Sequence, residues 1–149
     1  YGVKKYTNKK SDGSPAQRTD IPDTDFPVFR VSDAYLMYAE AVVRGATTGN
    51  LATAVDYVNQ IRTRAGATAI SSANLTLDFL LAERGRELFW ECHRRTDLIR
   101  FGKFTGGSKI WQWKGGVMNG MATDSYRDLM PIPSKTIQAN PTLKQNPGY

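Results

Sequence analysis

Residues 30–66 read "RVSDAYLMYAEAVVRGATTGNLATAVDYVNQIRTRAG", and this stretch decides the fold. Apolar side chains recur at spacings of three and four residues in both halves, which is typical of amphipathic helices. They are Tyr35, Tyr38, Ala39 and Val42 in the first half and Leu51, Ala54, Val55, Val58, Ile61 and Ala65 in the second. Ser32 and Asn50 have the side chains of N-caps. Gly45 and Gly66 stand where helices commonly end. The stretch therefore predicts two helices.

The two predicted helices are joined by only a few polar residues, so we expect them to pack antiparallel. Small side chains that permit close approach occur in both, at Ala39, Ala41, Ala52 and Ala54. The pair resembles a tetratricopeptide-type helical hairpin. One such hairpin cannot bury both of its faces, so we expect it to have helical neighbours.

A third helix is predicted from about Thr76 to Cys92, with Leu77, Leu80, Leu81, Leu88 and Phe89 as its apolar positions. Gly85 interrupts it at a cost of about 1 kcal/mol relative to alanine. A shorter helical segment, "RTDLIRFG", follows at residues 95–102 and ends at Gly102.

The other segments have no helical period. Residues 1–29 are polar and contain three prolines, which favours an irregular linker or loop. Residues 103–126 are rich in glycine, and the tail from residue 129 is a proline-rich coil with one short helix over Ser134–Ala139. The predicted fold is mainly α, a tetratricopeptide-like antiparallel hairpin with further helices, long irregular loops and a coil tail, whose helical domain spans residues 30–149.

Composition excludes several classes of function. The 149 residues suffice for one domain, and no apolar run is long enough to cross a bilayer. The net charge of +6 is scattered along the chain, whereas nucleic-acid binding concentrates basic residues in a patch. Cys92 and His93 are the only cysteine and histidine, too few for an internal disulfide or a zinc cluster. We expect no metal, no cofactor and no nucleic-acid partner.

The stretch "LAERGRELFWECHRRTDLIRFGKF", residues 81–104, has the composition of an active site. Glu83, Glu87 and Glu91 recur every four residues and so share one side of the predicted third helix. A di-iron site needs Glu-x-x-His on two helices, which one histidine cannot supply. A glycosidase needs two carboxylates that flank a bond, and one helical row lacks a facing partner. Cys92 and His93 would point about 100° apart on a helix, so they would not form a nucleophile–base pair.

A structural interpretation of these charges accounts for more of them. Acidic and basic residues alternate at helical spacings, so Glu83 can pair with Arg86, Glu87 with Arg84, and Glu91 with Arg94 or Arg95. Such a network fixes geometry where it is partly buried. The residues assigned to this structural network are Glu83, Arg84, Glu87, Arg95, Asp97 and Arg100. No catalytic residue is assigned.

Several blocks, in this order, closely resemble the C-terminal part of SusD/RagB-type proteins. They are "RVSDAYLMYAEAVVR", "AVDYVNQIRTRAG", "LLAERGRELFWECHRRTDLIRFGKF" and "LMPIPSKTIQANPTLKQNPGY". The resemblance covers roughly residues 28–149. One departure is Gly85, where the family pattern leads us to expect a helix former such as lysine or arginine.

The resemblance implies a surface-exposed outer-membrane lipoprotein that binds oligosaccharides or polysaccharides and is not an enzyme. Such proteins deliver the glycan to a TonB-dependent SusC-like transporter, over which they lie as a lid. The lipid anchor would be attached to a cysteine outside this chain, which would then be a fragment of a larger protein. The motif residues themselves belong to the scaffold, so the resemblance transfers no ligand contacts to them.

The local candidate for a sugar site is "KIWQWKGG", residues 109–116. If this piece is extended, Trp111 and Trp113 point to the same face, about 7 Å apart, and their indoles can stack on successive sugar rings. Asn119, Asp124 and Arg127 supply donors and acceptors for hydroxyl groups. The alternative is that the indoles are buried against the helical core, as tryptophans usually are.

Two other functions remain open at this point. A helical-repeat module that binds a protein partner, without glycan binding, is compatible with the hairpin. A carbohydrate hydrolase would require turnover of a glycan, which we do not expect.

Overall fold

The computed structural model describes residues 5–10 and 12–149. Within these residues it contains five α-helices, α1 (Val31–Val43), α2 (Leu51–Arg64), α3 (Leu77–Glu87), α4 (Arg94–Arg100) and α5 (Ser134–Ala139). Three short 3₁₀ turns, η1 (Ser72–Asn74), η2 (Lys114–Gly116) and η3 (Ser125–Asp128), lie between them. The described residues form no β-strand, only the isolated bridges Lys9–Pro15 and Gly106–Thr123. The prediction of a mainly helical fold is confirmed.

The chain divides into two compact units. The described residues up to Arg94 form the first unit, and Arg95–Tyr149 form the second. The irregular segment predicted over residues 1–29 has no helix where it is described, and residues 1–4 and 11 of it lie outside the described residues. No helix of the described chain is both long and apolar enough to span a membrane.

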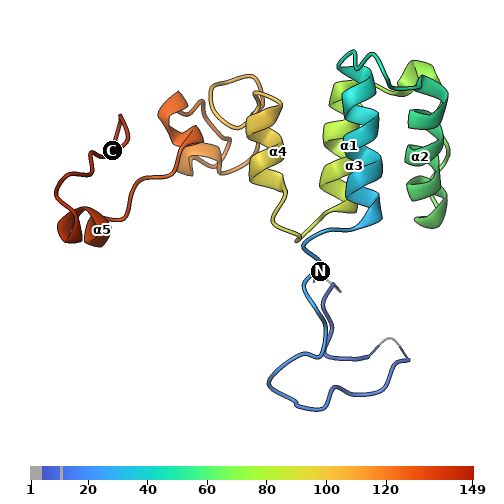
Figure 1. Ribbon diagram of the computed structural model, residues 1–149, viewed down its shortest axis with the longest axis horizontal. Helices are drawn as coiled ribbons and strands as arrows, with labels where there is room; N and C mark the ends of the chain where they lie inside the picture. The colour runs from blue at the N-terminus through green and yellow to red at the C-terminus, as the bar shows by residue number, and fades with distance from the viewer. Residues whose placement is uncertain (1–4, 11) are drawn as a thin grey trace. The chain divides into compact units, whose positions relative to one another are not determined.

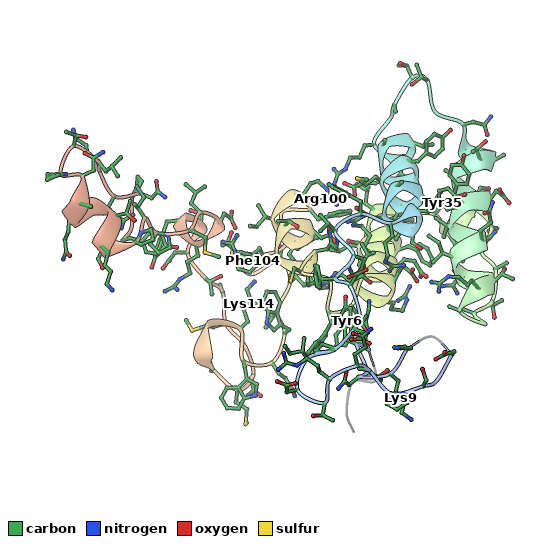
Figure 2. All side chains as sticks on the ribbon, turned by 60° about the horizontal axis from the view of Figure 1, so that its bottom comes forward. Tyr6, Lys9, Tyr35, Arg100, Phe104 and Lys114 are labelled. Atoms are coloured by element: carbon green, nitrogen blue, oxygen red, sulfur yellow. The ribbon has the colours of Figure 1, made fainter. Side chains whose placement is uncertain are left out.

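Helices α1 and α2 form an antiparallel hairpin, and α3 lies against α1 (Figure 1). The core between them is made by side chains that are fully buried, namely Leu36, Ala39, Ala54, Val58 and Leu80. At its edge the ring of Tyr35 (Figure 2) stacks on the ring of Tyr57, with 4.1 Å between centroids. The predicted helical neighbour of the hairpin is therefore α3.

The helix caps agree only in part with the prediction. The side chain of Asn50 accepts a hydrogen bond from Thr53 N at 3.0 Å, so Asn50 is the N-cap of α2 as predicted. Ser32 is not the N-cap of α1, because Arg30 occupies that position without a side-chain cap. The Arg30 side chain is instead directed to carboxylates near the end of α3.

The apolar stripes differ from the predicted ones by a few positions. Leu36 is fully buried, although the predicted apolar stripe of the first helix does not include it. Leu51 and Ala65, at the two ends of the stripe predicted for the second helix, are exposed.

The third helix ends earlier than predicted. It begins after the N-cap Thr76 but stops at Glu87 instead of continuing to Cys92. Trp90 and Cys92 have φ of 62°, the left-handed region that non-glycine residues rarely adopt, so the chain turns twice in three residues. Phe89 and Trp90, which a continued helix would have carried, are both exposed here.

The contacts around Gly85 explain why a glycine occurs inside α3. A Cβ atom there would lie 2.9 Å from Nη1 of Arg94, whose guanidinium rests over the glycine and donates to the Leu81 carbonyl oxygen at 2.8 Å. A glycine inside a helix lowers the stability of the helix, but here it permits the contact with Arg94. A lysine or arginine at this position would displace the Arg94 guanidinium.

The second unit is mostly irregular, as its sequence predicts. Helix α5 has the predicted bounds, and Gly102 follows α4 with a φ of 64°. The tail is held by side chains: Gln145 bonds both the N–H and the carbonyl of Ile132, and the ring of Tyr149 packs edge-on against Tyr126.

Replacing Leu36 by alanine is expected to lower the free energy of unfolding by about 3 kcal/mol, because a fully buried leucine leaves a cavity in a packed core. Urea unfolding of the protein, followed by circular dichroism, measures this. Met37→Ala is the matched control, since Met37 is the next residue of α1 but is half-exposed. Its effect should stay within about 0.5 kcal/mol, and equal losses in both variants would contradict the assigned core.

Candidate functional site

The carboxylates of Glu87 and Glu91 are both bound by one guanidinium. Arg30 donates to Glu87 Oε1 at 2.7 Å, to the Glu87 carbonyl oxygen at 2.7 Å, and to Glu91 Oε2 at 2.6 Å. Arg64, at the end of α2, donates to Glu87, and Lys5 pairs with Glu91. These contacts join the residue before α1, the end of α2, the end of α3 and the N-terminal segment.

Further buried carboxylates of the same unit are also held in ion pairs. Arg84 of α3 donates to Asp33 of α1 at 2.7 Å, and both side chains are buried. Glu83, also buried, accepts from Arg62 at 2.9 Å and from Arg86. Each acidic side chain is neutralised by arginine from another helix, which holds the helices in register.

The partners differ from those predicted for a single helical row. Glu83 does pair with Arg86, three residues on. Glu91 lies beyond the end of α3, so it is not in one row with Glu83 and Glu87, and among the described residues it takes Arg30 and Lys5 as its partners. The predicted pairing of Glu91 with Arg94 or Arg95 is wrong, because the turn at Trp90 directs it elsewhere.

Burial of the Glu91 carboxylate opposes its ionisation, but hydrogen bonds from Arg30 and Lys5 outweigh burial and hold the pKa of Glu91 below its ordinary value of 4.5. The hydrogen bond to Glu91 likewise raises the pKa of Arg30. Glu91 is therefore held as a charged carboxylate, which suits an ion pair rather than a proton donor.

The remaining residues of the predicted charge network lie in the second unit. Arg95 bonds to backbone, donating to the carbonyl oxygens of Arg127 at 2.9 Å and Asp128 at 3.2 Å. Its guanidinium also lies 4.9 Å from the ring centroid of Phe104. Asp97 is buried and accepts from Arg100 at 2.9 Å. Arg95 thus positions η3 instead of neutralising a carboxylate.

Cys92 and His93 are not on a helix, since both lie in the turn between α3 and α4. Cys92 is an exposed thiol and His93 is partly buried. Within the part of the chain that the structure describes, no group of three His, Cys, Asp or Glu residues is placed to hold a metal ion.

The early end of α3 creates a hollow that the sequence did not predict. It has a volume of about 660 Å³ and is lined mainly by apolar atoms of Ala82, Leu88, Phe89, Trp90 and Cys92, with Gly85, Arg84 and Arg94 completing it. It contains none of the predicted sugar-binding residues.

The tryptophan segment is not extended, so the predicted condition for a flat two-indole face is not met. Residues 112–116 form turns, and Trp113 has a left-handed φ of 69°. The loop is closed by Trp113 N, which donates to the Val117 carbonyl oxygen at 3.1 Å, and by Gly106 N, which donates to the Thr123 carbonyl oxygen at 2.7 Å. Both indoles are still accessible in this unit: Trp111 is 37% exposed and Trp113 is 65% exposed.

Asn119, Asp124 and Arg127 are also exposed, each in this loop or in the turn that follows it. The Arg127 guanidinium lies 5.2 Å from the ring centroid of Tyr126, and the Asp124 carbonyl oxygen accepts from Arg127 N. The five residues assigned to sugar binding therefore lie at the surface of the same unit.

Sequence reasoning missed Lys114, which directly follows the second tryptophan and is only 3% exposed. Nothing in the pattern "WQWKGG" distinguishes a buried lysine from a solvated one, because its partners are backbone carbonyls. Sequence reasoning also failed to identify Trp90 as a surface residue, because the predicted third helix continued past it to Cys92.

Comparison with known proteins decides the family. The profile of the SusD family matches residues 1–149, which extends the resemblance through the N-terminal segment. The chain belongs to the SusD family. It is 42% identical over 149 residues to the starch-binding protein SusD of Bacteroides thetaiotaomicron, covering 99% of this chain and 26% of that protein. It is 36% identical over 132 residues to the SusD-like protein P25 of Formosa agariphila, covering 82% and 24%.

Solved structures support the same family assignment. A SusD superfamily protein from Parabacteroides distasonis matches with a TM-score of 0.65 at 28% identity, over 90% of this chain and 29% of that one. Surface glycan-binding protein A from Bacteroides uniformis matches with a TM-score of 0.64 at 27% identity, over 81% and 27%. This SusD-family chain spans about a quarter of the length of the curated relatives it matches. Two of these proteins are named for binding, one as a starch-binding protein and one as a surface glycan-binding protein.

Replacing Glu91 by glutamine is expected to lower the free energy of unfolding at pH 7 by about 2 kcal/mol, because charged hydrogen bonds to Arg30 and Lys5 are lost. The depressed pKa of Glu91 stabilises the folded state fully above pH 4.5, and this contribution is lost as the pH falls through the lowered value. The variant should therefore lose less stability than the unaltered protein between neutral pH and strong acid.

Urea unfolding at a series of pH values measures both effects. Asp25→Asn is the control, because Asp25 is an exposed carboxylate in the same unit. Identical pH profiles for the Glu91→Gln variant and the unaltered protein would refute the assigned role of Glu91.

Proposed function

We propose that this chain is part of a cell-surface protein that binds oligosaccharides or polysaccharides without cleaving them. The observation that carries the proposal is the 42% identity, along the whole chain, to a protein named for binding starch. The structural likeness to a surface glycan-binding protein supports the same class of ligand.

The proposed contact surface in this chain is the loop with Trp111 and Trp113. Both indoles are accessible, and the C–H faces of a sugar ring pack well on an aromatic surface. Asn119, Asp124 and Arg127 are exposed nearby in the sequence and offer directional donors and acceptors for hydroxyl groups. Because Trp113 is in a left-handed turn, the two indoles are not placed by the alternation of side chains along an extended strand.

The bound glycan is passed to a TonB-dependent SusC-like transporter at the outer membrane, where a lipid anchors the protein. This part of the proposal rests on the resemblance to SusD/RagB-type proteins. The charge network supports a non-catalytic role, because Glu83, Glu87 and Glu91 are each held in ion pairs by basic partners.

A helical-repeat module that binds a protein partner without glycan binding is the second candidate. The observation that favours it is the apolar hollow beside the exposed Phe89 and Trp90, since exposed aromatic residues are common at protein interfaces. If this second candidate is correct, Trp90 contributes to binding of the protein partner, and Trp111 and Trp113 do not.

Trp111→Ala and Trp113→Ala are each expected to weaken glycan binding by the full-length protein about tenfold, since burying an aromatic side chain is worth about 1.5–3 kcal/mol. Affinity electrophoresis in gels that contain soluble starch or other polysaccharides provides the screen, and calorimetry then measures the affinity. Trp90→Ala is the matched control, because Trp90 is outside the loop and about as exposed as Trp113.

The outcomes separate the candidates. Full affinity in the double variant Trp111→Ala/Trp113→Ala would exclude the loop as the contact surface. A full-length protein that binds no polysaccharide in the screen would overturn the glycan-binding proposal itself.

A further inference from the structure

Lys114 is a buried cation inside the tryptophan loop (Figure 2). Its Nζ donates to the carbonyl oxygen of Gly106 at 2.7 Å and to that of Lys109 at 2.6 Å. The ring centroid of Trp111 lies 4.7 Å from the same nitrogen. The ammonium group therefore contacts the start of the loop and the face of one indole at the same time.

Burying an ammonium group is unfavourable unless its donors are satisfied. Lysine has three N–H donors, and here two of them reach carbonyl oxygens while the π-face of Trp111 supplies an attractive third neighbour. Moving the side chain away would leave two carbonyls and an indole without this partner, so the geometry is strongly preferred.

The backbone of Lys114 fixes the rest of the loop. Its N–H donates to the Trp111 carbonyl oxygen at 3.1 Å, and its own carbonyl oxygen accepts from Met121 N at 3.0 Å. Trp113, directly before it, is in the left-handed conformation, which is unfavourable for a bulky residue and needs surrounding contacts to maintain it. Lys114 thus links both ends of the loop and both tryptophans.

We infer that Lys114 is the positioning residue of the glycan-contact loop: its ammonium group holds Trp111 against the carbonyls of Gly106 and Lys109 and so fixes the face that Trp111 offers to a sugar. The inference rests on the proposed function of the loop. Because the ammonium group is buried and its donors are used, Lys114 acts through Trp111 and does not itself touch the ligand. The indole face turned away from Lys114 is the one that receives the sugar.

The test compares three variants of the full-length protein labelled with 5-fluorotryptophan. Lys114→Met keeps the length of the side chain and removes the charge, and Lys114→Arg keeps the charge and donors. Lys109→Met is the matched control, because the Lys109 side chain is exposed and only its backbone carbonyl takes part. The ¹⁹F resonance of Trp111, assigned by its disappearance in Trp111→Phe, is recorded without ligand, and affinity for soluble starch is then measured by calorimetry.

In the ligand-free spectrum, Lys114→Met should shift or broaden the Trp111 resonance and leave that of Trp90 unchanged, while Lys109→Met changes neither. Affinity should fall roughly threefold to tenfold in Lys114→Met, in proportion to a lost aromatic contact, and recover in part in Lys114→Arg. An unchanged Trp111 resonance in Lys114→Met would overturn the inference, whether or not starch binds.

A shifted resonance with unaltered affinity in Lys114→Met would also overturn the positioning role. A shifted resonance in a protein that binds no polysaccharide would refute the proposed function and leave the control of Trp111 by Lys114 standing. If Lys114→Met lowers the far-ultraviolet circular dichroism, the same comparison is made between Lys114→Gln, which keeps a donor but removes the charge, and the unaltered protein, where a Trp111 resonance unchanged in position and width overturns the inference.

Discussion

The contact of Arg30 with Glu87 and Glu91 is the constraint on which the first unit depends. A guanidinium has donors in a rigid fork, so it can bind two carboxylates only if they are held at fixed positions. That requirement places the residue before α1 beside the end of α3. It also explains why Arg30 stands at the N-cap position of α1 without capping the helix, since its side chain is directed to Glu87 and Glu91.

The elements that the sequence predicted are those set by local chemistry. Asn50 caps α2 through an amide oxygen only three residues from its donor, and Gly66 follows the same helix with a positive φ. The bounds of α5 follow from Pro133 and the residues next to it. Non-local partners decided the rest. Nothing near Trp90 and Cys92 in the sequence favours a left-handed conformation. That conformation is maintained by ion pairs that Glu91 forms with Arg30 and Lys5, which lie 61 and 86 positions earlier in the chain.

Gly85 and Lys114 show the same limit at the level of single residues. In the sequence, Gly85 is a weak point in a helix, and Lys114 is an ordinary surface charge. In the structure, the missing side chain at Gly85 makes room for the guanidinium of Arg94, and the amine of Lys114 is enclosed by backbone carbonyls. Both roles depend on which group the folded chain brings to the residue, and neither a propensity nor a spacing contains that information.

The placement of Trp111 and Trp113 also differs between the sequence prediction and the structure. An extended strand would place alternate side chains on one face by its period alone, and the sequence prediction relied on that period. The structure uses a different means, because a turned backbone has no such period and a buried cation must hold the indole instead. The turn residues Gly115, Gly116 and Gly120 all have positive φ, so the course of this loop depends on its turns and not on the period of a strand. Under the proposed function, the helices carry the family signature and this loop carries the specificity for the glycan.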